Sequence, residues 1–393
     1  FLDLGFQPPS NAYLKFDDLK KAEIYLPLQI LVCERCWLVQ TEDYASSDSY
    51  FTEDYAYFSS VSSTWLAHAK EYSGMITNRL GLDKESFVIE VASNDGYLLK
   101  NFVANNIPCL GVEPTESTAL VAIEAGIPVM QEFFGKQLAL NQFADQKADL
   151  ILGNNVYAHV PDINDFTSGL KHSLKHGGTI TLEFPHLLSL IESNQFDTVY
   201  HEHFSYLSLL AVQRVFEKQG LRVFDVEKLT THGGSLRLYG CHQEDSRENT
   251  DEIQSILNAE ITAKLDSVET YQSFQPKAEA VKNDLLRFLL DQKREGKIVA
   301  AYGAAAKGNT LLNYAGVQRD LVEFVCDAAP SKQDKYMPGS HIPILDPSHL
   351  QKRAVDFVLI LPWNLADEIA QQLSYLRKGG TKFVIAVPEL RIF

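Results

Sequence analysis

The sequence predicts an α/β protein built from two parallel sheets that are covered by helices. From about residue 84 to residue 191, short apolar segments alternate with helix-like segments, and a second alternation begins near residue 297. Such alternation is typical of parallel sheets with helices on their faces. At 393 residues, the chain is also longer than one hydrophobic core usually grows, so two or three folded units are expected.

The composition is typical of a folded protein and excludes several classes of partner. Hydrophobic residues make up 45% of the chain and charged residues 22%, which argues against wholesale disorder. The net charge of −16 repels nucleic-acid backbones, and no basic cluster offsets it. No apolar run approaches the roughly 18 residues that cross a bilayer, and no signal-like segment opens the sequence. We therefore expect a cytoplasmic protein without nucleic-acid or membrane partners; its oligomeric state is not predicted.

The first predicted unit, residues 1–63, is aromatic and irregular, and we expect it to lack a core of its own. It contains the one close pair of cysteines in the chain, Cys33 and Cys36, in a C-x-x-C motif. Two thiolates are half of a tetrahedral zinc site, which needs two further ligands. The other three cysteines lie in or beside apolar segments and are expected to be buried core residues.

The second predicted unit, residues 64–248, contains a strand, a small-residue turn and a helix around the segment EVASNDG, residues 90–96. Glu113 ends the next predicted strand about twenty residues after Glu90, where nucleotide-binding units place the carboxylate that holds a ribose. Because Ala92 and Asn94 stand where a dinucleotide loop would have glycine, a cationic adenosine ligand fits better than a pyrophosphate. A structural turn without a ligand is the alternative.

The predicted strands of this unit span residues 87–92, 109–113, 148–154 and 179–184. Beyond them lies the segment YHEHFSY, residues 200–206, whose density of titratable groups favours chemistry. If the segment is extended, Tyr200 and Glu202 share one face while His201 and His203 share the other. A metal site is one interpretation, although further ligands at helpful spacing are not evident. A histidine is otherwise the natural general base for removing a proton beside a ketone.

A helical connector is predicted over residues 249–294, followed by a last α/β unit over residues 295–393. Its predicted strands span residues 297–302, 321–327, 357–361 and 383–387. The turn after the first of them has small residues and Lys307, which suit a diphosphate, although a structural turn is the alternative. The glycine-hinged loop at residues 231–237 is interpreted as a sugar or phosphate contact, or equally as a hairpin turn.

The segments quoted above, together with NNVYAHVPD (residues 154–162) and QEFFG (residues 131–135), resemble the class I S-adenosylmethionine methyltransferases. Within that class they are similar to the subgroup that methylates carbon atoms of nucleotide-linked deoxysugars. The resemblance implies an α/β fold with a class I methyltransferase Rossmann-like domain, a second Rossmann-like C-terminal domain and a small N-terminal zinc-module segment. In that subgroup the remaining zinc ligands come from an earlier C-x-x-C, which the visible start of this sequence lacks. Either preceding residues supply those ligands or the site is lost, and we expect structural zinc in the full-length protein.

The resemblance and the patterns above assign residues to four kinds of site. The expected contacts of S-adenosylmethionine are Glu90, Ala92, Asn94, Asp95, Gly96, Glu113, Pro114, Phe133, Phe134, Asn154 and Asn155. The expected catalytic residues are Tyr200, Glu202, His203, His159 and Tyr57, the last favoured over Tyr55. The expected substrate contacts are Gly303, Ala304, Ala305, Lys307, Asn309, Asp327, Lys332 and Arg237. The expected zinc ligands are Cys33 and Cys36.

By this resemblance, the acceptor is a nucleoside diphosphate 4-keto-deoxysugar that is methylated at carbon 3. Removing the proton beside the keto group gives an enolate that attacks the methyl group in line. We expect His203 to be the base, with oxyanion contact, proton relay and orientation shared among Tyr200, His159 and Glu202. The alternatives are an NAD(P)-dependent nucleotide-sugar oxidoreductase and a catalytically silent sugar-nucleotide-binding protein.

Overall fold

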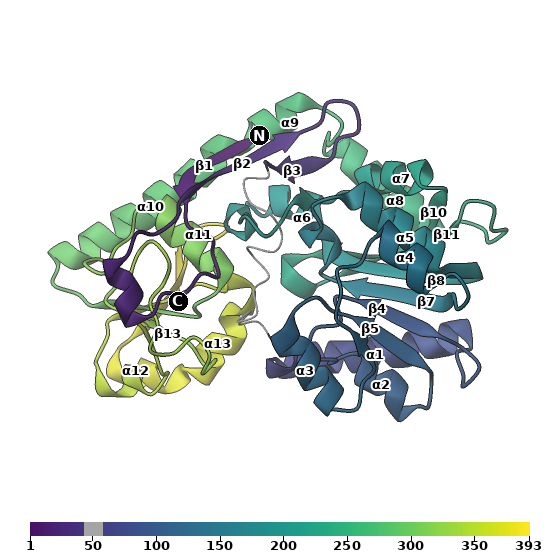
Figure 1. Cartoon of the computed structure of the whole chain (residues 1–393). Helices are drawn as coiled ribbons and strands as arrows, with labels where there is room; N and C mark the ends of the chain where they lie inside the picture. The colour runs from purple at the N-terminus through teal and green to yellow at the C-terminus, as the bar shows by residue number, and fades with distance from the viewer. Residues whose placement is uncertain (43–57) are drawn as a thin grey trace.

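The computed structural model describes residues 1–42 and 58–393, whose strands form sheets of four, seven and six strands. The seven-stranded sheet and its helices make a first lobe, and the six-stranded sheet and its helices make a second lobe (Figure 1). The N-terminal strands and the long helix α10 (Phe274–Arg294) run along the top of the second lobe toward the first. The predicted α/β class is confirmed.

The first lobe has the strand order β10-β11-β8-β7-β4-β5-β6, in which β11 is antiparallel to both of its neighbours. The four predicted strands are found as β4, β5, β7 and β8, while β6, β10 and β11 were not predicted. The strands are β4 (Val88–Val91), β5 (Cys109–Val112), β6 (Val129–Met130), β7 (Ala148–Asn154), β8 (Leu174–Pro185), β10 (Leu221–Leu229) and β11 (Ser235–His242).

Helices cover both faces of this sheet because its central strands are apolar on both sides. Every residue of β4 is buried; Val88 faces a core shared with α1 and α2, and Ile89 faces the core of α5 and α7. Burial of both faces is what the continuous apolar pattern of a parallel strand predicts. The helices are α1 (Ser63–Leu80), α2 (Leu99–Ala104), α3 (Glu116–Glu124), α4 (Lys136–Gln142), α5 (Ile163–Ser173) and α7 (Leu209–Lys218). Helix α6 (Leu187–Glu192) packs instead in the hydrophobic cluster of the second lobe.

The second lobe has the strand order β14-β13-β12-β15-β16-β17, parallel except for the last strand. The four predicted strands are found as β12, β13, β15 and β16. The strands are β12 (Val299–Tyr302), β13 (Val325–Cys326), β14 (Ile344–Leu345), β15 (Phe357–Ile360), β16 (Lys382–Ile385) and β17 (Arg391–Ile392). The remaining helices are α8 (Asp251–Thr262), α9 (Val268–Gln272), α11 (Ala306–Tyr314), α12 (His349–Lys352) and α13 (Ala366–Gln372).

The N-terminal segment forms part of a sheet that it does not complete alone. The strands β1 (Leu2–Gln7), β2 (Leu26–Val32) and β3 (Val39–Thr41) are joined by β9 (Ser205–Tyr206), which comes from the first lobe. Buried residues of β1 and β2 belong to the same hydrophobic cluster as residues of α10 and of the six-stranded sheet. The N-terminal segment therefore packs against the second lobe, whereas the last strand of its sheet, β9, belongs to the first lobe. The predicted domain limits at 63/64, 248/249 and 294/295 stay a prediction.

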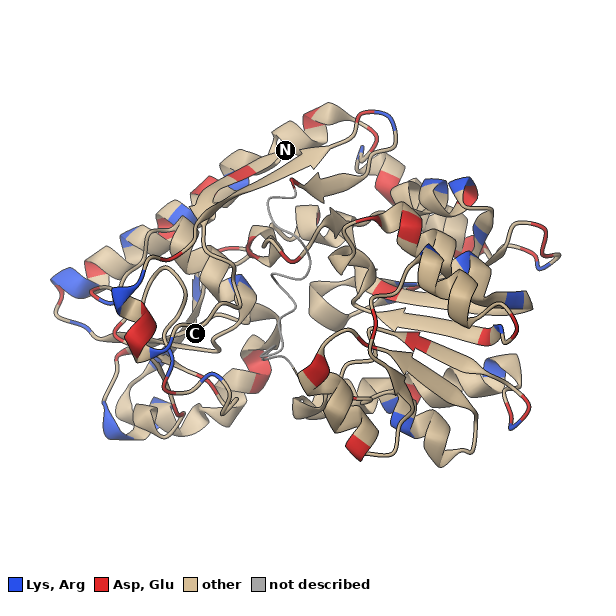
Figure 2. Cartoon of the chain, in the orientation of Figure 1, with Lys and Arg blue, Asp and Glu red and all other residues tan. Residues whose placement is uncertain are grey.

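Figure 2 shows Lys and Arg residues interspersed with Asp and Glu residues along the helices and loops. Within the described ranges, none of the helices combines the length and the apolar character that a membrane span requires.

The connector is fastened to the first lobe by a buried carboxylate on α8. Glu260 accepts hydrogen bonds from the backbone N–H groups of Leu209 (2.7 Å) and Leu210 (2.8 Å), at the start of α7. It also contacts Nε2 of His186 at 2.7 Å. Glu260 therefore satisfies two N–H groups that a helix leaves unpaired at its N-terminus.

We predict that Glu260→Ala lowers the free energy of unfolding by about 3 kcal/mol, because the buried N–H groups and His186 lose their partner. Urea unfolding measures the change. Glu252→Ala, on the exposed face of the same helix, is the control and is expected to cost less than about 1 kcal/mol. Equal midpoints for the two variants would contradict the prediction.

Candidate functional site

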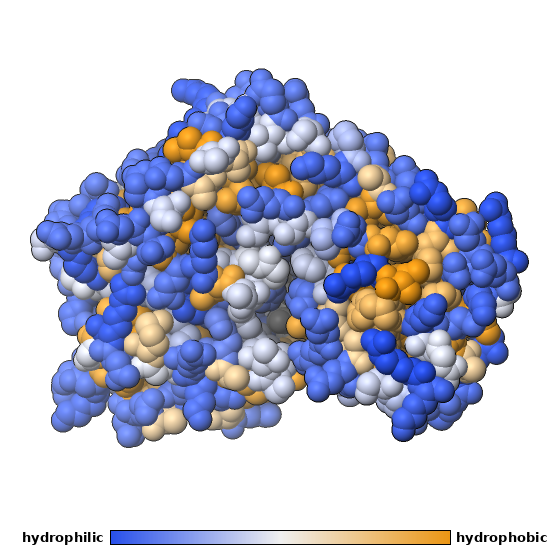
Figure 3. Space-filling view, turned by 180° about the vertical axis from the view of Figure 1, so that it is seen from behind, coloured by the Kyte–Doolittle hydropathy of each residue, from blue (hydrophilic) through white to orange (hydrophobic). Residues whose placement is uncertain are grey.

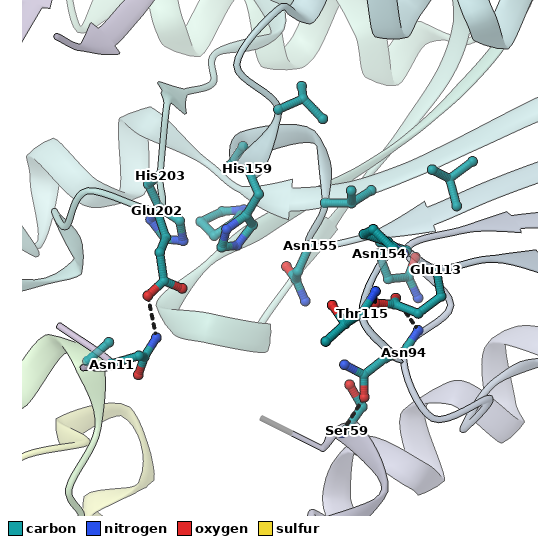
Figure 4. A pocket seen from close by; sticks show the side chains of 18 of the residues that line it. Asn11, Ser59, Asn94, Glu113, Thr115, Asn154, Asn155, His159, Glu202 and His203 are labelled. Atoms are coloured by element: carbon teal, nitrogen blue, oxygen red, sulfur yellow. Dashed lines mark hydrogen bonds between the residues drawn. The ribbon is translucent and has the colours of Figure 1, made fainter. Parts of the chain in front are cut away.

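A cavity of about 540 Å³ lies between the two lobes, within the size range of small-molecule sites. The surface is hollowed between the lobes when the molecule is seen from behind (Figure 3). The cavity opens at the carboxyl ends of β4, β5 and β7, where ligands of open α/β sheets bind. Figure 4 shows Glu113 and Asn94 on one side of it, Glu202 and His203 on the other, and Asn155 between them.

The turn after β4 has the strained backbone of a binding loop. Ala92, Asn94 and Gly96 have positive φ angles of 55°, 49° and 74°, which are uncommon for residues with a side chain. At Gly96 a Cβ atom would lie 2.2 Å from the side chain of Ile127, so only glycine fits there. Ala92 and Asn94 line the cavity, whereas Asp95 and Gly96 support the turn from behind.

Glu113 is fixed at the cavity wall by backbone hydrogen bonds. Its Oε2 atom accepts from the N–H of Asn94 at 2.9 Å, and its Oε1 atom accepts from the N–H of Thr115 at 3.0 Å. The carboxylate is thereby oriented before any ligand arrives, and each oxygen keeps acceptor capacity. The geometry suits a ligand with neighbouring hydroxyl groups, such as a ribose.

The same side of the cavity contains buried polar atoms that have no hydrogen-bond partner among the described residues. The side-chain amide of Asn154 has buried oxygen and nitrogen atoms without a hydrogen bond within the described part of the chain, and so has the Oδ1 atom of Asn155. Buried polar groups are normally paired. Pro114, Phe133 and Phe134 also line this region, so aromatic and amide groups lie together as an adenosine moiety would require.

Glu90 lies away from the cavity wall. Its side chain is buried within the sheet, and the residue is not among those that line the cavity. Burial raises the pKa of Glu90 well above its ordinary value, and the nearby carboxylates of Glu113 and Asp95 add to the shift. The expectation that Glu90 contacts the cofactor stays a prediction.

The His-rich segment is a turn rather than an extended strand. The prediction that Glu202 and His203 lie on opposite faces was therefore wrong. The N–H of His203 donates to the carbonyl oxygen of Tyr200 at 2.9 Å, which closes the turn. Tyr200, Glu202 and His203 consequently all line the cavity. His201 instead donates from Nε2 to the Pro27 carbonyl at 3.1 Å, on the N-terminal sheet.

His203 is held in one orientation at the centre of this cluster. Its Nδ1 atom lies 3.0 Å from the carbonyl oxygen of Thr198, and because a carbonyl only accepts, Nδ1 carries the hydrogen and neutral His203 has its lone pair on Nε2. The ring centroids of Tyr200 and His159 lie 4.0 and 4.6 Å from that of His203. Burial lowers the pKa of His203 well below its ordinary value, and His159 adds to the effect.

Glu202 is buried beside the same cavity and is bonded by a residue from the N-terminal segment. The Asn11 amide donates to Oε1 of Glu202 at 2.8 Å. Burial raises the pKa of Glu202 to about 7, although the Asn11 hydrogen bond opposes the shift. Burial also lowers the pKa of His159 to about 4. Neutral imidazoles and a carboxyl group that titrates near neutral pH can therefore exchange protons with a ligand.

The second lobe contributes three of the predicted substrate contacts to the cavity, namely Ala305, Lys307 and Lys332. Lys307 donates to Oδ1 of Asn364 at 2.8 Å, and its ammonium group lies 4.7 Å from the ring centre of Trp363. Burial lowers the pKa of Lys307 from its ordinary value.

The other predicted contacts of the second lobe support the turn instead of lining the cavity. Asp327 accepts from the N–H of Ala304 at 2.7 Å, just as Glu113 accepts from the turn of the first lobe. Gly303 has a φ of 89°, and the amide of Asn309 donates to the Ser10 carbonyl at 2.5 Å. Their contact with a substrate stays a prediction.

Arg237 lies on β11, the strand that follows the loop at residues 231–234. It does not line the cavity. Its guanidinium group pairs with Glu183 at 3.0 Å and with Glu227 at 3.1 Å. The loop contributes His232 instead, with a φ of 55°. Burial lowers the pKa of His232 to about 4.

The sequence interpretation missed several lining residues, of which Asn11, Trp65, Thr198 and His232 are examples. Of these residues, only His232 lies beside a sequence pattern that indicated a site, namely the adjacent glycines. The others reach the cavity through the packing of the folded chain. Tyr57, one of the expected catalytic residues, lies outside the described residues.

The expected zinc ligands lie in the turn between β2 and β3. Backbone N–H groups of Cys36 and Arg35 lower the pKa of the Cys33 thiol, which favours the thiolate form that binds metal. Over residues 1–42 and 58–393, no cluster of three or more potential metal ligands is formed. Burial raises the pKa of the Cys36 thiol. Two cysteines can supply two of the four ligands that a tetrahedral zinc site requires.

The comparisons with known proteins extend over the whole chain. Residues 65–226 match the family profile described as "Methyltransferase domain", residues 230–388 match "C-methyltransferase C-terminal domain", and residues 1–51 match "Putative zinc binding domain". C-methyltransferase NovU of Streptomyces niveus is 31% identical over 395 residues, which cover 100% of this chain and 93% of that protein.

Solved structures match the chain over one part of its length. The PH0226 protein of Pyrococcus horikoshii OT3 is 13% identical, with a TM-score of 0.40 over 48% of this chain and 95% of that chain. Magnesium protoporphyrin IX methyltransferase (ChlM) of Synechocystis PCC 6803 is 13% identical, with a TM-score of 0.35 over 45% of this chain and 84% of that chain.

The geometry at Glu113 predicts that Glu113→Ala weakens the binding of S-adenosylhomocysteine by roughly 1 to 3 kcal/mol, because charged hydrogen bonds to the ribose are lost. Calorimetry measures the change in dissociation constant. Glu124→Ala, at the exposed end of α3, is the matched control and should bind like the wild type. Unchanged affinity in Glu113→Ala would place the adenosine elsewhere.

Proposed function

Since the chain belongs to the S-adenosylmethionine-dependent C-methyltransferase family, we propose that it methylates carbon 3 of a nucleoside diphosphate 4-keto-deoxysugar. The comparisons establish an enzyme that transfers a methyl group from S-adenosylmethionine to carbon. They do not favour the alternative of an NAD(P)-dependent oxidoreductase. The proposal concerns the acceptor and the residues that act on it.

One observation carries the proposal: a single cavity contains both the Glu113 region and the cluster around His203. Glu113, Asn154 and Asn155 are proposed to hold the adenosine and methionine parts of the cofactor. When bound there, S-adenosylmethionine supplies a methyl group on a positively charged sulfur atom. The proton-transferring groups lie on the opposite side of the same cavity, where an acceptor would be held between them and the methyl group.

His203 is proposed to remove the proton from carbon 3 of the acceptor. The proton goes to Nε2 of His203, and the electrons of the C–H bond move toward the neighbouring keto oxygen. The resulting enolate carbon then forms a bond to the methyl carbon while the S–CH₃ bond breaks, leaving neutral S-adenosylhomocysteine. Tyr200, His159 and Glu202 are proposed to stabilise the enolate oxygen or relay the proton. Such groups lower the barrier because they are oriented in advance.

The second lobe is proposed to hold the nucleoside diphosphate. Lys307 and Lys332 bring two cationic groups into the cavity, and each is already oriented by a neutral partner, Asn364 for Lys307 and the Ala304 carbonyl for Lys332. A diphosphate bound there can place its sugar toward the first lobe. In this proposal the first lobe holds S-adenosylmethionine and the second lobe holds the nucleoside diphosphate. Both ligands must therefore bind in one cavity, and the cavity between the lobes permits this.

Zinc is proposed to have a structural role, held in part by Cys33 and Cys36 at the turn between β2 and β3. No step of the methyl transfer uses it.

The proposed acceptor is tested by incubating the enzyme with S-adenosylmethionine and a panel of nucleoside diphosphate 4-keto-deoxysugars. Mass spectrometry should detect the gain of one methyl group, and NMR spectroscopy should place it on carbon 3. The matching sugars without a keto group are the control and should not react, because their C–H bond is not acidified. Methylation at oxygen, or of the control sugars, would overturn the proposal.

The proposed role of His203 predicts that His203→Ala and His203→Asn abolish turnover while the affinity for S-adenosylhomocysteine stays within about threefold, because a lost base need not disturb cofactor binding. Single-turnover kinetics and calorimetry measure the two effects. Turnover like that of the wild type in either variant would remove His203 as the base.

A further inference from the structure

The N-terminal segment brings a side chain to the proposed catalytic residues of the first lobe. Asn11 lines the cavity, and its amide donates to Oε1 of Glu202 at 2.8 Å. Glu202 lies in the turn at residues 200–203, next to His203. The sequence patterns did not single out Asn11. The contact joins segments 191 residues apart.

Asn11 is fastened to the second lobe on both sides. The carbonyl of the preceding residue, Ser10, accepts from the amide of Asn309 at 2.5 Å. Two residues later, the hydroxyl of Tyr13 donates to the Ala304 carbonyl at 2.5 Å. Both partners belong to the turn and helix that also carry Lys307. The position of Asn11 is therefore fixed by the second lobe, whereas Glu202 belongs to the first lobe.

The Asn11 amide is the only side chain within the described ranges that donates a hydrogen bond to the Glu202 carboxyl group. The two lysines of the cavity are engaged elsewhere, Lys307 with Asn364 and Lys332 with the Ala304 carbonyl and Asp327. Among the described side chains, the neutral amide of Asn11 is therefore the one that stabilises the charged form of the buried Glu202 carboxyl group by a hydrogen bond.

The other titratable groups around Glu202 come from three directions. Tyr13 approaches from the N-terminal segment, and burial raises its pKa well above the ordinary value. His159 faces the backbone carbonyl of Glu202, and burial lowers the pKa of this histidine to about 4. Tyr200 and His203 lie in the same turn as Glu202, and Lys307 and Lys332 line the cavity from the second lobe. Among the described residues, Asn11 donates a hydrogen bond to the carboxyl group of Glu202 and so favours its charged form.

We propose that Asn11 is a positioning residue, held by the second lobe, that sets the orientation and the ionisation of Glu202 in the first lobe. An amide N–H stabilises the carboxylate form in preference to the neutral form. The pair thereby makes the protonation state of an active-site group depend on the contact between the lobes. For catalysis this inference rests on the proposed function, but the ionisation of Glu202 can be measured without any acceptor.

The test is a ¹³C NMR titration of the enzyme labelled at the glutamate side-chain carboxyl carbon. The resonance that disappears in Glu202→Gln identifies Glu202. We expect a titration midpoint near neutral pH in the wild type, raised by about one pH unit in Asn11→Ala, since a charged hydrogen bond is lost. Asn11→Asp should raise it further, because two adjacent carboxylates repel each other. Asn258→Ala, which removes an exposed asparagine bonded to Gln254, should leave it unchanged.

The same change is expected in the pH dependence of turnover. Glu202→Gln should remove the limb of the pH–rate profile that reports the ionisation of Glu202. In both Asn11 variants this limb should move to higher pH, whether turnover requires the protonated or the ionised form of Glu202. A merely structural role would lower the rate at every pH without moving that limb. An unmoved midpoint in either folded variant overturns the inference. Absence of methylation of every keto-sugar by the wild type would overturn the proposed function while leaving the NMR result to decide the role of Asn11.

Discussion

The enclosure of several ionisable groups in one cavity between two lobes is the constraint on which the site depends. Burial is the main cause that lowers the pKa of His159 to about 4 and raises that of Glu202 to about 7. Each shift disfavours the charged form of its group, as desolvation must. Neutral imidazoles and a carboxyl group near its midpoint follow from the enclosure, and they are the groups that proton transfer to and from a ligand requires.

This enclosure needs elements from every part of the chain. The N-terminal strands share a core with α10 and the six-stranded sheet, and β9 of the first lobe completes their sheet. The lobes also meet directly, because the indole N–H of Trp363 donates to Asp197 at 2.8 Å. The two turns that follow β4 and β12 use one device, in which an acidic residue from the next strand accepts from the N–H of the turn. In the proposed function, the first of these turns holds the adenosine and the second holds the nucleotide of the acceptor.

Much of the site could be predicted where it follows from local pattern. The strand and turn around residues 90–96, the acid at Glu113 and the amides after β7 all line or support the cavity, because parallel strands bring their carboxyl ends to one edge of a sheet. The arrangement around Glu202 could not be predicted in the same way. The alternation rule for an extended strand placed His203 and Glu202 on opposite faces, but a hydrogen-bonded turn brings both to the cavity.

The sequence by itself determined the two α/β units, their turns and the kinds of side chain available for chemistry, because strand periodicity and turn composition are local properties. Only the tertiary structure decided which of those side chains meet. Arg237 pairs with the buried Glu183 and the partly exposed Glu227, whereas Asn11, Trp65 and His232 line the cavity. The physical reason is that contacts between distant segments depend on how the lobes and the N-terminal sheet pack, and no short stretch of sequence carries that information.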